Sequence, residues 1–250
     1  MADIPKAQDQ LFDAHSSALD KYARLVIGRP GWPALVKHEL ITLASQAVPG
    51  ALGLVLRKFL YPRLLGACGR NVVFGQNVVL RHPGKIQVGD DVVIDDNCLL
   101  DAKGDTNGGI TIGSGVFVGR NTILSCKNGD IAIGDRANIG FNCEIFSASR
   151  VTVGAEALLA AYCSVGGGDH DYADTSTPVT AQGRRSQGVS VGDGVWMGAG
   201  AKILDGVRFG GHAIIGAGAV VRVDVPEYAV AGGRPARILG MRGGHQAPAE

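Results

Sequence analysis

The sequence predicts a parallel β-helix built from six-residue repeats and preceded by an α-helical region. Apolar residues recur at every sixth position, most regularly from Val191 to Val221. Glycine accounts for 38 of the 250 residues, well above the roughly 7% of average proteins. Because 46% of the residues are nevertheless hydrophobic, the chain needs many tight corners around an apolar interior. A fixed short period of this kind determines the architecture before any local assignment of secondary structure.

Residues 1–71 have helical spacing instead of the six-residue period. Apolar residues at intervals of three and four predict an amphipathic helix that begins near Leu11 and ends at Gly28-Arg29-Pro30. A second apolar stretch, Leu40 to Leu56, has no charged residue and is broken by Pro49-Gly50. It is shorter than the roughly 20 residues that a membrane-spanning helix needs. We therefore expect a broken helical hairpin that packs on the rest of the protein.

The same region is basic. Residues 21–63 contain seven Lys and Arg residues against one Glu, and these charges flank the apolar stretch. Segments that are both basic and apolar can lie on an anionic membrane surface. Peripheral membrane contact through residues 21–63 is thus an alternative to plain helical packing.

The six-residue spacing extends over residues 72–242 and predicts the β-helix domain. Three repeats make one coil, in which an apolar residue points inward and the next residue, often Gly or Asp, turns a corner. Coils pair at about 4.8 Å, so six or seven of them build a prism roughly 30 Å long. The step from Val153 to Val191 is longer by 20 residues than an 18-residue coil of three repeats. We place the resulting loop at residues 166–189 and expect residues 243–250 to form a disordered tail.

The long loop carries His170 within the segment GGDHDY. Long irregular excursions from a compact domain are often functional. Histidine suits proton transfer because its pKa lies near neutral pH. We therefore expect His170 to be catalytic. Asp169, Asp171 and Glu156 are equal candidates for the group that orients its ring.

The chain resembles the hexapeptide-repeat acyltransferases over residues 72–242. The segments that carry the resemblance are GGDHDY, VWMGAGAKIL, IIGAGAVV and DVPEYAVAGGRPARI. The family includes sugar and surface-polysaccharide O-acetyltransferases and, less closely similar, serine acetyltransferase. The resemblance implies a left-handed β-helix, a homotrimer, and acetyl-CoA as acyl donor in the groove between neighbouring prisms. It also implies that His170 is the general base.

The expected CoA-binding residues follow from the same resemblance, and all of them lie after the long loop. Small residues let the CoA arm lie flat against the prism, an aromatic ring supplies an apolar surface, and arginines pair with phosphates. The implied contacts are Trp196, Gly198, Ala199, Ala217, Arg222 and Arg237. Corner packing is an alternative role for Trp196, and a solvated coil edge is the alternative for Arg222.

The sequence therefore predicts an acyl-CoA-dependent O-acyltransferase with acetyl as the acyl group. We expect its acceptor to be a sugar hydroxyl in polysaccharide or glycolipid synthesis. A serine or amino-sugar acceptor and a non-catalytic β-helix scaffold are the alternatives. A zinc carbonic anhydrase on this helix needs clustered histidines, whereas the histidines nearest to His170 in sequence are His82 and His212. No metal is expected.

Charge and cysteine usage limit the expected partners and the expected cellular location of the protein. The net charge of +1 gives no reason to expect a nucleic-acid partner. The five cysteines have no CxxC spacing and are expected to be small buried residues in a reducing compartment. The N-terminus lacks a secretory pattern. We expect a cytoplasmic protein, with the membrane surface as an alternative location.

Overall fold

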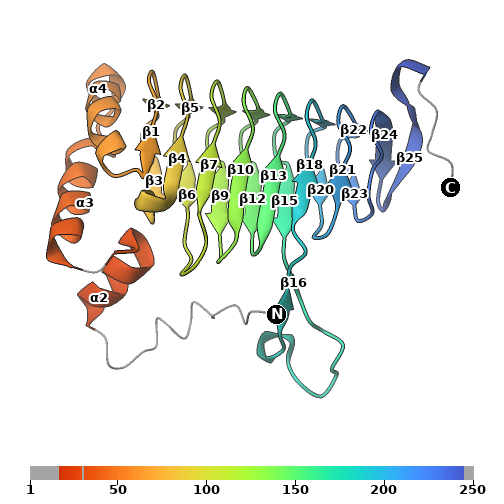
Figure 1. Ribbon diagram of the computed structural model, residues 1–250, viewed down its shortest axis with the longest axis horizontal. Coiled ribbons are helices and arrows are strands. Elements are labelled where there is room, and N and C mark those ends of the chain that lie inside the picture. The colour runs from red at the N-terminus through yellow and green to blue at the C-terminus, as the bar shows by residue number, and fades with distance from the viewer. Residues whose placement is uncertain (1–16, 30, 245–250) are drawn as a thin grey trace.

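The computed structural model of the protein describes residues 17–29 and 31–244. Most of its strands are only two to four residues long, and successive strands alternate among three sheets. Strand β1 (Ala67–Cys68) lies in the first sheet, β2 (Val73–Phe74) in the second and β3 (Val79–Arg81) in the third. Each later coil repeats this order, so that the sheets form the three walls of a prism (Figure 1). This is the left-handed parallel β-helix that the repeat and the resemblance predicted.

The strands stack in sequence order within each wall. The first sheet continues with β4 (Ile86–Val88), β7 (Ile110–Ile112), β10 (Asp130–Ile133), β13 (Arg150–Val153), β18 (Val189–Val191) and β21 (Arg208–Phe209). The second contains β5 (Val93–Ile94), β8 (Phe117–Val118), β11 (Asn138–Ile139), β14 (Leu158–Leu159), β19 (Trp196–Met197), β22 (Ile214–Ile215), β24 (Ala229–Gly233) and β25 (Ala236–Met241). The third contains β6 (Leu99–Asp101), β9 (Ile123–Cys126), β12 (Glu144–Ser147), β15 (Ser164–Gly167), β20 (Lys202–Ile203) and β23 (Val220–Val221).

The core is a set of columns of stacked apolar side chains. In the second sheet the pairs Phe74–Ile94 and Met197–Ile215 are in register, and all four side chains are buried. Their preceding neighbours point outward, because successive side chains of a strand face opposite sides. Four of the five cysteines are buried in the same core (Cys98, Cys126, Cys143 and Cys163).

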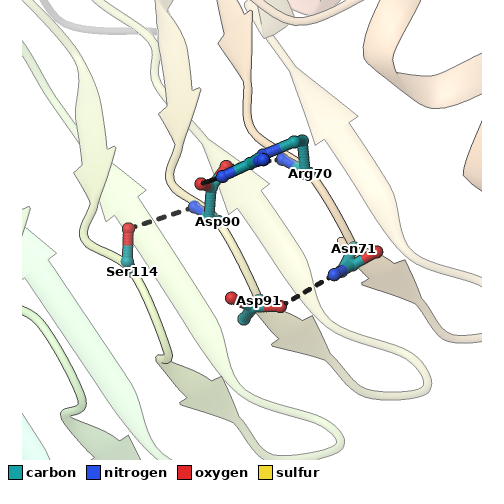
Figure 2. A network of polar contacts seen from close by, with 5 residues as sticks. All are labelled: Arg70, Asn71, Asp90, Asp91 and Ser114. Carbon is teal, nitrogen blue, oxygen red and sulfur yellow. Dashed lines mark hydrogen bonds and ion pairs between the residues drawn. The ribbon is translucent and has the colours of Figure 1, made fainter.

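Corners between sheets use left-handed backbone conformations. Asn71 and Asp91 have φ of 55° and 57°, values that Asn and Asp tolerate better than most residues. They occupy equivalent corners of neighbouring coils, where Asn71 Nδ2 donates to Asp91 Oδ1 at 3.1 Å. Figure 2 shows this pair beside the bonds from Arg70 to Asp90 and from the Asp90 N–H to Ser114. The corners therefore stack as ladders of polar contacts outside the apolar core.

The insertions between coils gather at one corner, between the third and the first sheet. Leu100 pairs with Leu124 and Val165 pairs with Ile203, so the extra residues of these coils leave the prism after the third sheet. Figure 1 shows these loops along one edge, and the longest extends well beyond the others. That loop contains β16 (Asp169–His170), a 3-10 turn (Val179–Ala181) and β17 (Arg184–Arg185). It is the excursion predicted at residues 166–189.

Helices cover the N-terminal end of the prism (Figure 1). They comprise α2 (Ala18–Tyr22), which a π-helical turn (Ala23–Ile27) continues, then α3 (Trp32–Ser45) and α4 (Gly50–Leu60), with a 3-10 turn at Tyr61–Arg63. Elsewhere, 3-10 turns lie between β3 and β4 (Pro83–Lys85) and after β25 (Arg242–Gly244). The break between α3 and α4 falls at Pro49, as the hairpin prediction required. The first strand begins at Ala67, a few residues before the predicted start of the β-helix. The expected helical positions before residue 17, and residues 245–250, lie outside the described residues.

His82 lies where the helices meet the first coil. Its backbone N–H donates to Val26 O at 2.7 Å, and its two ring nitrogens are buried with no hydrogen-bond partner among the described residues. Burial lowers the pKa of His82 below 6.5, and Lys85 and Lys103 act in the same direction. The Asp101 carboxylate and the Arg24 backbone act in the opposite direction but do not cancel the effect of burial. Burial in the folded state therefore favours the neutral form of this imidazole.

We predict that the protein loses stability as the pH falls below about 6.5, because the unfolded chain then binds a proton that the folded chain does not. The effect ends below the lowered folded-state pKa, and its slope for one proton is at most ~1.4 kcal/mol per pH unit. Urea unfolding at pH 7.5 and pH 5.5 measures it. His82→Asn, which suits the φ of 50°, should unfold with a weaker pH dependence. An equal dependence in both proteins contradicts the prediction.

Candidate active site

The long loop leaves the prism through a glycine run. Gly167 ends β15, and a Cβ atom at this position would lie 2.8 Å from Val151 Cγ2, so the close approach of backbone to core requires glycine. Two residues later, β16 pairs with β17 in an antiparallel ladder that sets His170 opposite Arg184. The His170 N–H donates to Asp169 Oδ1 at 2.8 Å. The loop therefore presents His170 on a short, hydrogen-bonded ribbon.

His170 lines a cleft of about 60 Å³ at the base of this ribbon. Its Nδ1 atom is buried and has no hydrogen-bond partner within the part of the chain that the structure describes. The cleft is lined by Lys127, Phe146, Ala148, Gly168, Asp169, His170, Arg184 and Arg185. An imidazole in such a site can accept or donate a proton to a molecule bound beside it.

The three carboxylates proposed to orient the ring have other partners. Asp169 accepts from the His170 backbone, Asp171 pairs with Arg185 at 2.8 Å, and Glu156 pairs with Arg136 at 2.9 Å. Among the described residues, none of the three makes a hydrogen bond to the imidazole. The orientation of the ring therefore comes from the β16–β17 ribbon and from packing in the cleft.

Two cations in the cleft did not emerge from the sequence analysis. Arg184 lies opposite His170 in the ribbon, and Lys127 reaches the cleft from the loop between β9 and β10. Burial lowers the pKa of Lys127, and Arg184 and Lys103 lower it further by charge repulsion. The adjacent arginines in the loop segment GRRSQG are a sequence signal that could have indicated Arg184. Lys127 is far from His170 in sequence and has no such signal.

Three of the expected CoA-binding residues lie together at the corner between the second and third sheets. Gly198 follows β19 and Ala217 follows β22, and these strands are paired neighbours. A Cβ atom on Gly198 would lie 2.6 Å from the Ala217 nitrogen, which explains why glycine is needed there. Ala199 is exposed beside them, and its carbonyl accepts from the Gly218 N–H at 2.8 Å. The result is a flat wall of small residues.

The other expected contacts are more widely spread. Trp196 points outward from the second sheet and is 48% exposed. Arg222 is exposed after β23, at the same corner from which the His170 loop departs, and Arg237 lies in β25 opposite Gly232. Arg234 lies next to the small-residue wall, since its Nε donates to the Gly218 carbonyl at 2.6 Å. The wall thus has an arginine at its C-terminal end.

Comparison with protein families identifies the repeat. The model described as the hexapeptide repeat of succinyl-transferase matches residues 130–166 and 188–222. The repeat region of the chain is therefore similar to this hexapeptide-repeat model over these two segments. The two matched segments lie on either side of the His170 loop, which falls in the gap between them, and the second contains Trp196, Ala199 and Ala217.

Similar proteins are acetyltransferases by name. A probable acetyltransferase of Mycobacterium tuberculosis is 29% identical over 133 residues, which is 53% of this chain and 44% of the relative. Galactoside O-acetyltransferase of Escherichia coli is 30% identical over 134 residues, which is 52% of this chain and 62% of that protein. The chain thus spans about half the length of these curated relatives.

A solved structure shares the fold of this chain. It is a mutant of AntD, an N-acyltransferase from Bacillus cereus, in complex with a dTDP-amino sugar and coenzyme A. It aligns with a TM-score of 0.52 and 18% identity, over 71% of this chain and 84% of that chain. At this identity the likeness concerns the fold alone.

Proposed function

We propose that the hexapeptide-repeat chain is an acyl-CoA-dependent O-acyltransferase that transfers acetyl to a sugar hydroxyl in polysaccharide or glycolipid synthesis. The observation that carries the proposal is the placement of His170 in a cleft on the one long loop that interrupts the repeats. The relatives named as acetyltransferases support the acetyl group. AntD, which shares the fold and was solved with coenzyme A, supports a CoA donor.

The proposed reaction needs one base and no metal. The acceptor oxygen attacks the thioester carbonyl carbon while His170 takes the hydroxyl proton. Because Nδ1 is buried, we assign the transfer to Nε2, with Nδ1 carrying the ring proton. Collapse of the tetrahedral intermediate breaks the C–S bond, and the imidazolium returns its proton to the departing CoA thiolate. The products are the acetyl ester and CoA.

The proposed donor site is the wall formed by Gly198, Ala199 and Ala217. The pantetheine arm carries amide groups that can bond to exposed backbone groups along this corner. Trp196 would cover the arm, and Arg222 and Arg237 would pair with the phosphates, with Arg234 as an additional cation. The acetyl thioester would then reach the His170 cleft across the outer face of the third sheet.

The outer face of the second sheet supports the homotrimer. Its outward side chains form a nearly continuous apolar column of Val73, Val93, Phe117, Asn138, Leu158, Trp196, Ile214 and Val230. The outward column of the first sheet is mainly polar, with Gln87, Thr111, Ala132, Thr152, Ser190 and Arg208. Large contiguous apolar surfaces mark interaction sites, and packing such walls together creates the groove proposed for CoA.

The transfer reaction is tested by thiol release from acetyl-CoA with a panel of sugars, lipid-linked sugars, amino sugars and serine. O-acetylated sugar as the product supports the proposal, whereas acetylserine or an N-acetylated amino sugar would favour the alternative acceptors. If no acceptor raises the rate of CoA release above the uncatalysed rate, the result would favour the non-catalytic β-helix scaffold.

The helices at the N-terminal end carry an exposed apolar face, which we propose lies on an anionic membrane surface. On α3, Trp32, Val36, Leu40 and Leu43 recur at helical spacing and are 47–84% exposed. Leu52, Val55 and Phe59 on α4 are exposed at the same kind of spacing. Exposed Lys37, Lys58 and Arg63 flank them, and this charge complements anionic headgroups. None of the described helices is long and apolar enough to cross a bilayer.

Flotation with liposomes tests this face. We predict that the protein floats with vesicles containing phosphatidylglycerol and much less with phosphatidylcholine alone, because cations and apolar side chains act together. Leu43→Glu, which changes the most exposed of these side chains, should reduce the bound fraction several-fold. Leu239→Glu changes a leucine in β25 that is 71% exposed and should have no effect. Equal loss in both variants, or no binding by the wild type, contradicts the membrane proposal.

A further inference from the structure

The His170 cleft has an excess of positive charge that proton transfer does not explain. Lys127, Arg184 and Arg185 line it, while Asp169 is the only carboxylate among the described residues that line it. Arg185 is paired with Asp171 at 2.8 Å, whereas no ion pair forms at Lys127 or Arg184 within the described chain. Two uncompensated cations therefore lie beside the proposed base.

The fold brings these cations together from different coils. The Lys127 N–H donates to Ser147 O at 2.7 Å, and the Ala148 N–H donates to Gly167 O at 2.8 Å. These bonds stack the loop of Lys127, the next loop and the start of the His170 loop at one corner. A third cation, Lys103, lies in the coil before Lys127, since the Asn128 N–H donates to Lys103 O at 3.2 Å.

Holding like charges together costs free energy unless an anion compensates. The lowered pKa of Lys127, which burial and the repulsion of Arg184 and Lys103 produce, is a sign of that cost. Arg184 faces His170 across the ribbon, and a guanidinium binds carboxylate or phosphate oxygens with two parallel N–H bonds. A cleft of about 60 Å³ has room for one small group and not for a sugar ring.

We propose that Lys127 and Arg184 bind an anionic group, a carboxylate or a phosphate, on the acceptor of the reaction. This inference rests on the proposed function, because it places the anion next to the hydroxyl whose proton His170 takes. The phosphates of CoA are a poor occupant, since the whole pantetheine arm separates them from the thioester. The acceptor class is thus an acidic or phosphorylated sugar and not a neutral one.

Binding to the CoA-loaded protein tests the charge preference without turnover. Calorimetry would compare glucose with glucuronate and glucose 6-phosphate, and galactose with galacturonate and galactose 6-phosphate. We expect the charged members of one series to bind at least tenfold more tightly than the neutral member, and the carboxylate and phosphate arms distinguish the two anions. Lys127→Met and Arg184→Met should remove most of this preference and leave neutral sugars unaffected. Lys58→Met, an exposed cation on α4, is the matched control.

Two outcomes separate this inference from the proposed function. If charged and neutral sugars bind alike, or if Lys127→Met and Arg184→Met bind charged sugars as the wild type does, the anion site is wrong even where acetyl transfer persists. If the charge preference is present but His170→Ala transfers acetyl at the normal rate, the site stands as a binding site and the proposed chemistry falls. A rise in the KM for acetyl-CoA alone in the two variants would assign the cations to the donor and overturn the inference.

Discussion

His170→Ala is expected to lower the kcat of acetyl transfer by about 100- to 10,000-fold, the range that a general base contributes. Without the imidazole, the acceptor hydroxyl must lose its proton to water as the C–O bond forms. The KM for acetyl-CoA should change little, because the proposed donor wall at Gly198, Ala199 and Ala217 belongs to other coils. Thiol release from acetyl-CoA at saturating acceptor measures the effect.

A matched variant keeps this test specific to the position of the histidine. His212 is exposed and stacks on Tyr228 with ring centroids 5.3 Å apart, at a corner away from the loop. His212→Ala should retain near-normal kcat. Similar losses in both variants would indicate a general disturbance of the prism, and normal transfer by His170→Ala would remove the base from the mechanism.

The repeat predicted the prism well because one physical rule acts on every coil. A residue such as Met197 or Ile215 must be apolar at each sixth position to fill the interior, so the period itself identifies the walls and the core. The break in the helical hairpin was equally predictable from the sequence, because Pro49 cannot continue α3. The same regularity made the interruption at His170 conspicuous, and the structure confirms a loop at that point.

The residues that line the His170 cleft could not be predicted, because no repeating rule determines how the loops fold. Lys127 meets the His170 loop only because insertions of different lengths stack at one corner, and the six-residue period does not determine how such loops fold. Sequence spacing also failed to show that none of the three candidate carboxylates bonds to the imidazole, since they pair with Arg185, Arg136 and the backbone. Sequence spacing locates positions on a coil but not the contacts between loops.

All seven cations of residues 21–63 were also treated alike in the sequence analysis, as charges that could contact a membrane. Arg57, one of these cations, is only 1% exposed and is not available to a membrane. Its Nε donates to Phe74 O at 2.9 Å, and its Nη1 donates to Ser45 O at 2.8 Å and Val48 O at 2.7 Å. The guanidinium therefore satisfies carbonyls at the C-terminal end of α3 and in the connection to α4 while it joins both helices to the first coil.

Arg57→Met is expected to destabilise the fold by about 3–5 kcal/mol. The methionine fills much of the volume but leaves two buried carbonyls (Phe74 and Ser45) and one partly buried carbonyl (Val48) without this donor. Each buried unsatisfied group costs about 1–3 kcal/mol before local relaxation. The stability of Arg57→Lys should lie between that of the wild type and that of Arg57→Met. One ammonium cannot donate to Phe74 O on one side and to Ser45 O and Val48 O on the other. Urea unfolding at fixed protein concentration measures the change, since assembly makes stability depend on concentration.

Lys58→Met provides the control for Arg57, because it removes the neighbouring charge from the exposed side of α4. It should change stability by no more than ~0.5 kcal/mol. If Arg57→Met unfolded at the same urea concentration as Lys58→Met, the buried guanidinium would not be what fixes α3 and α4 to the prism. If only Arg57→Met is destabilised, it should also lose binding to anionic vesicles, because the apolar face of α3 and α4 depends on the positions that Arg57 sets.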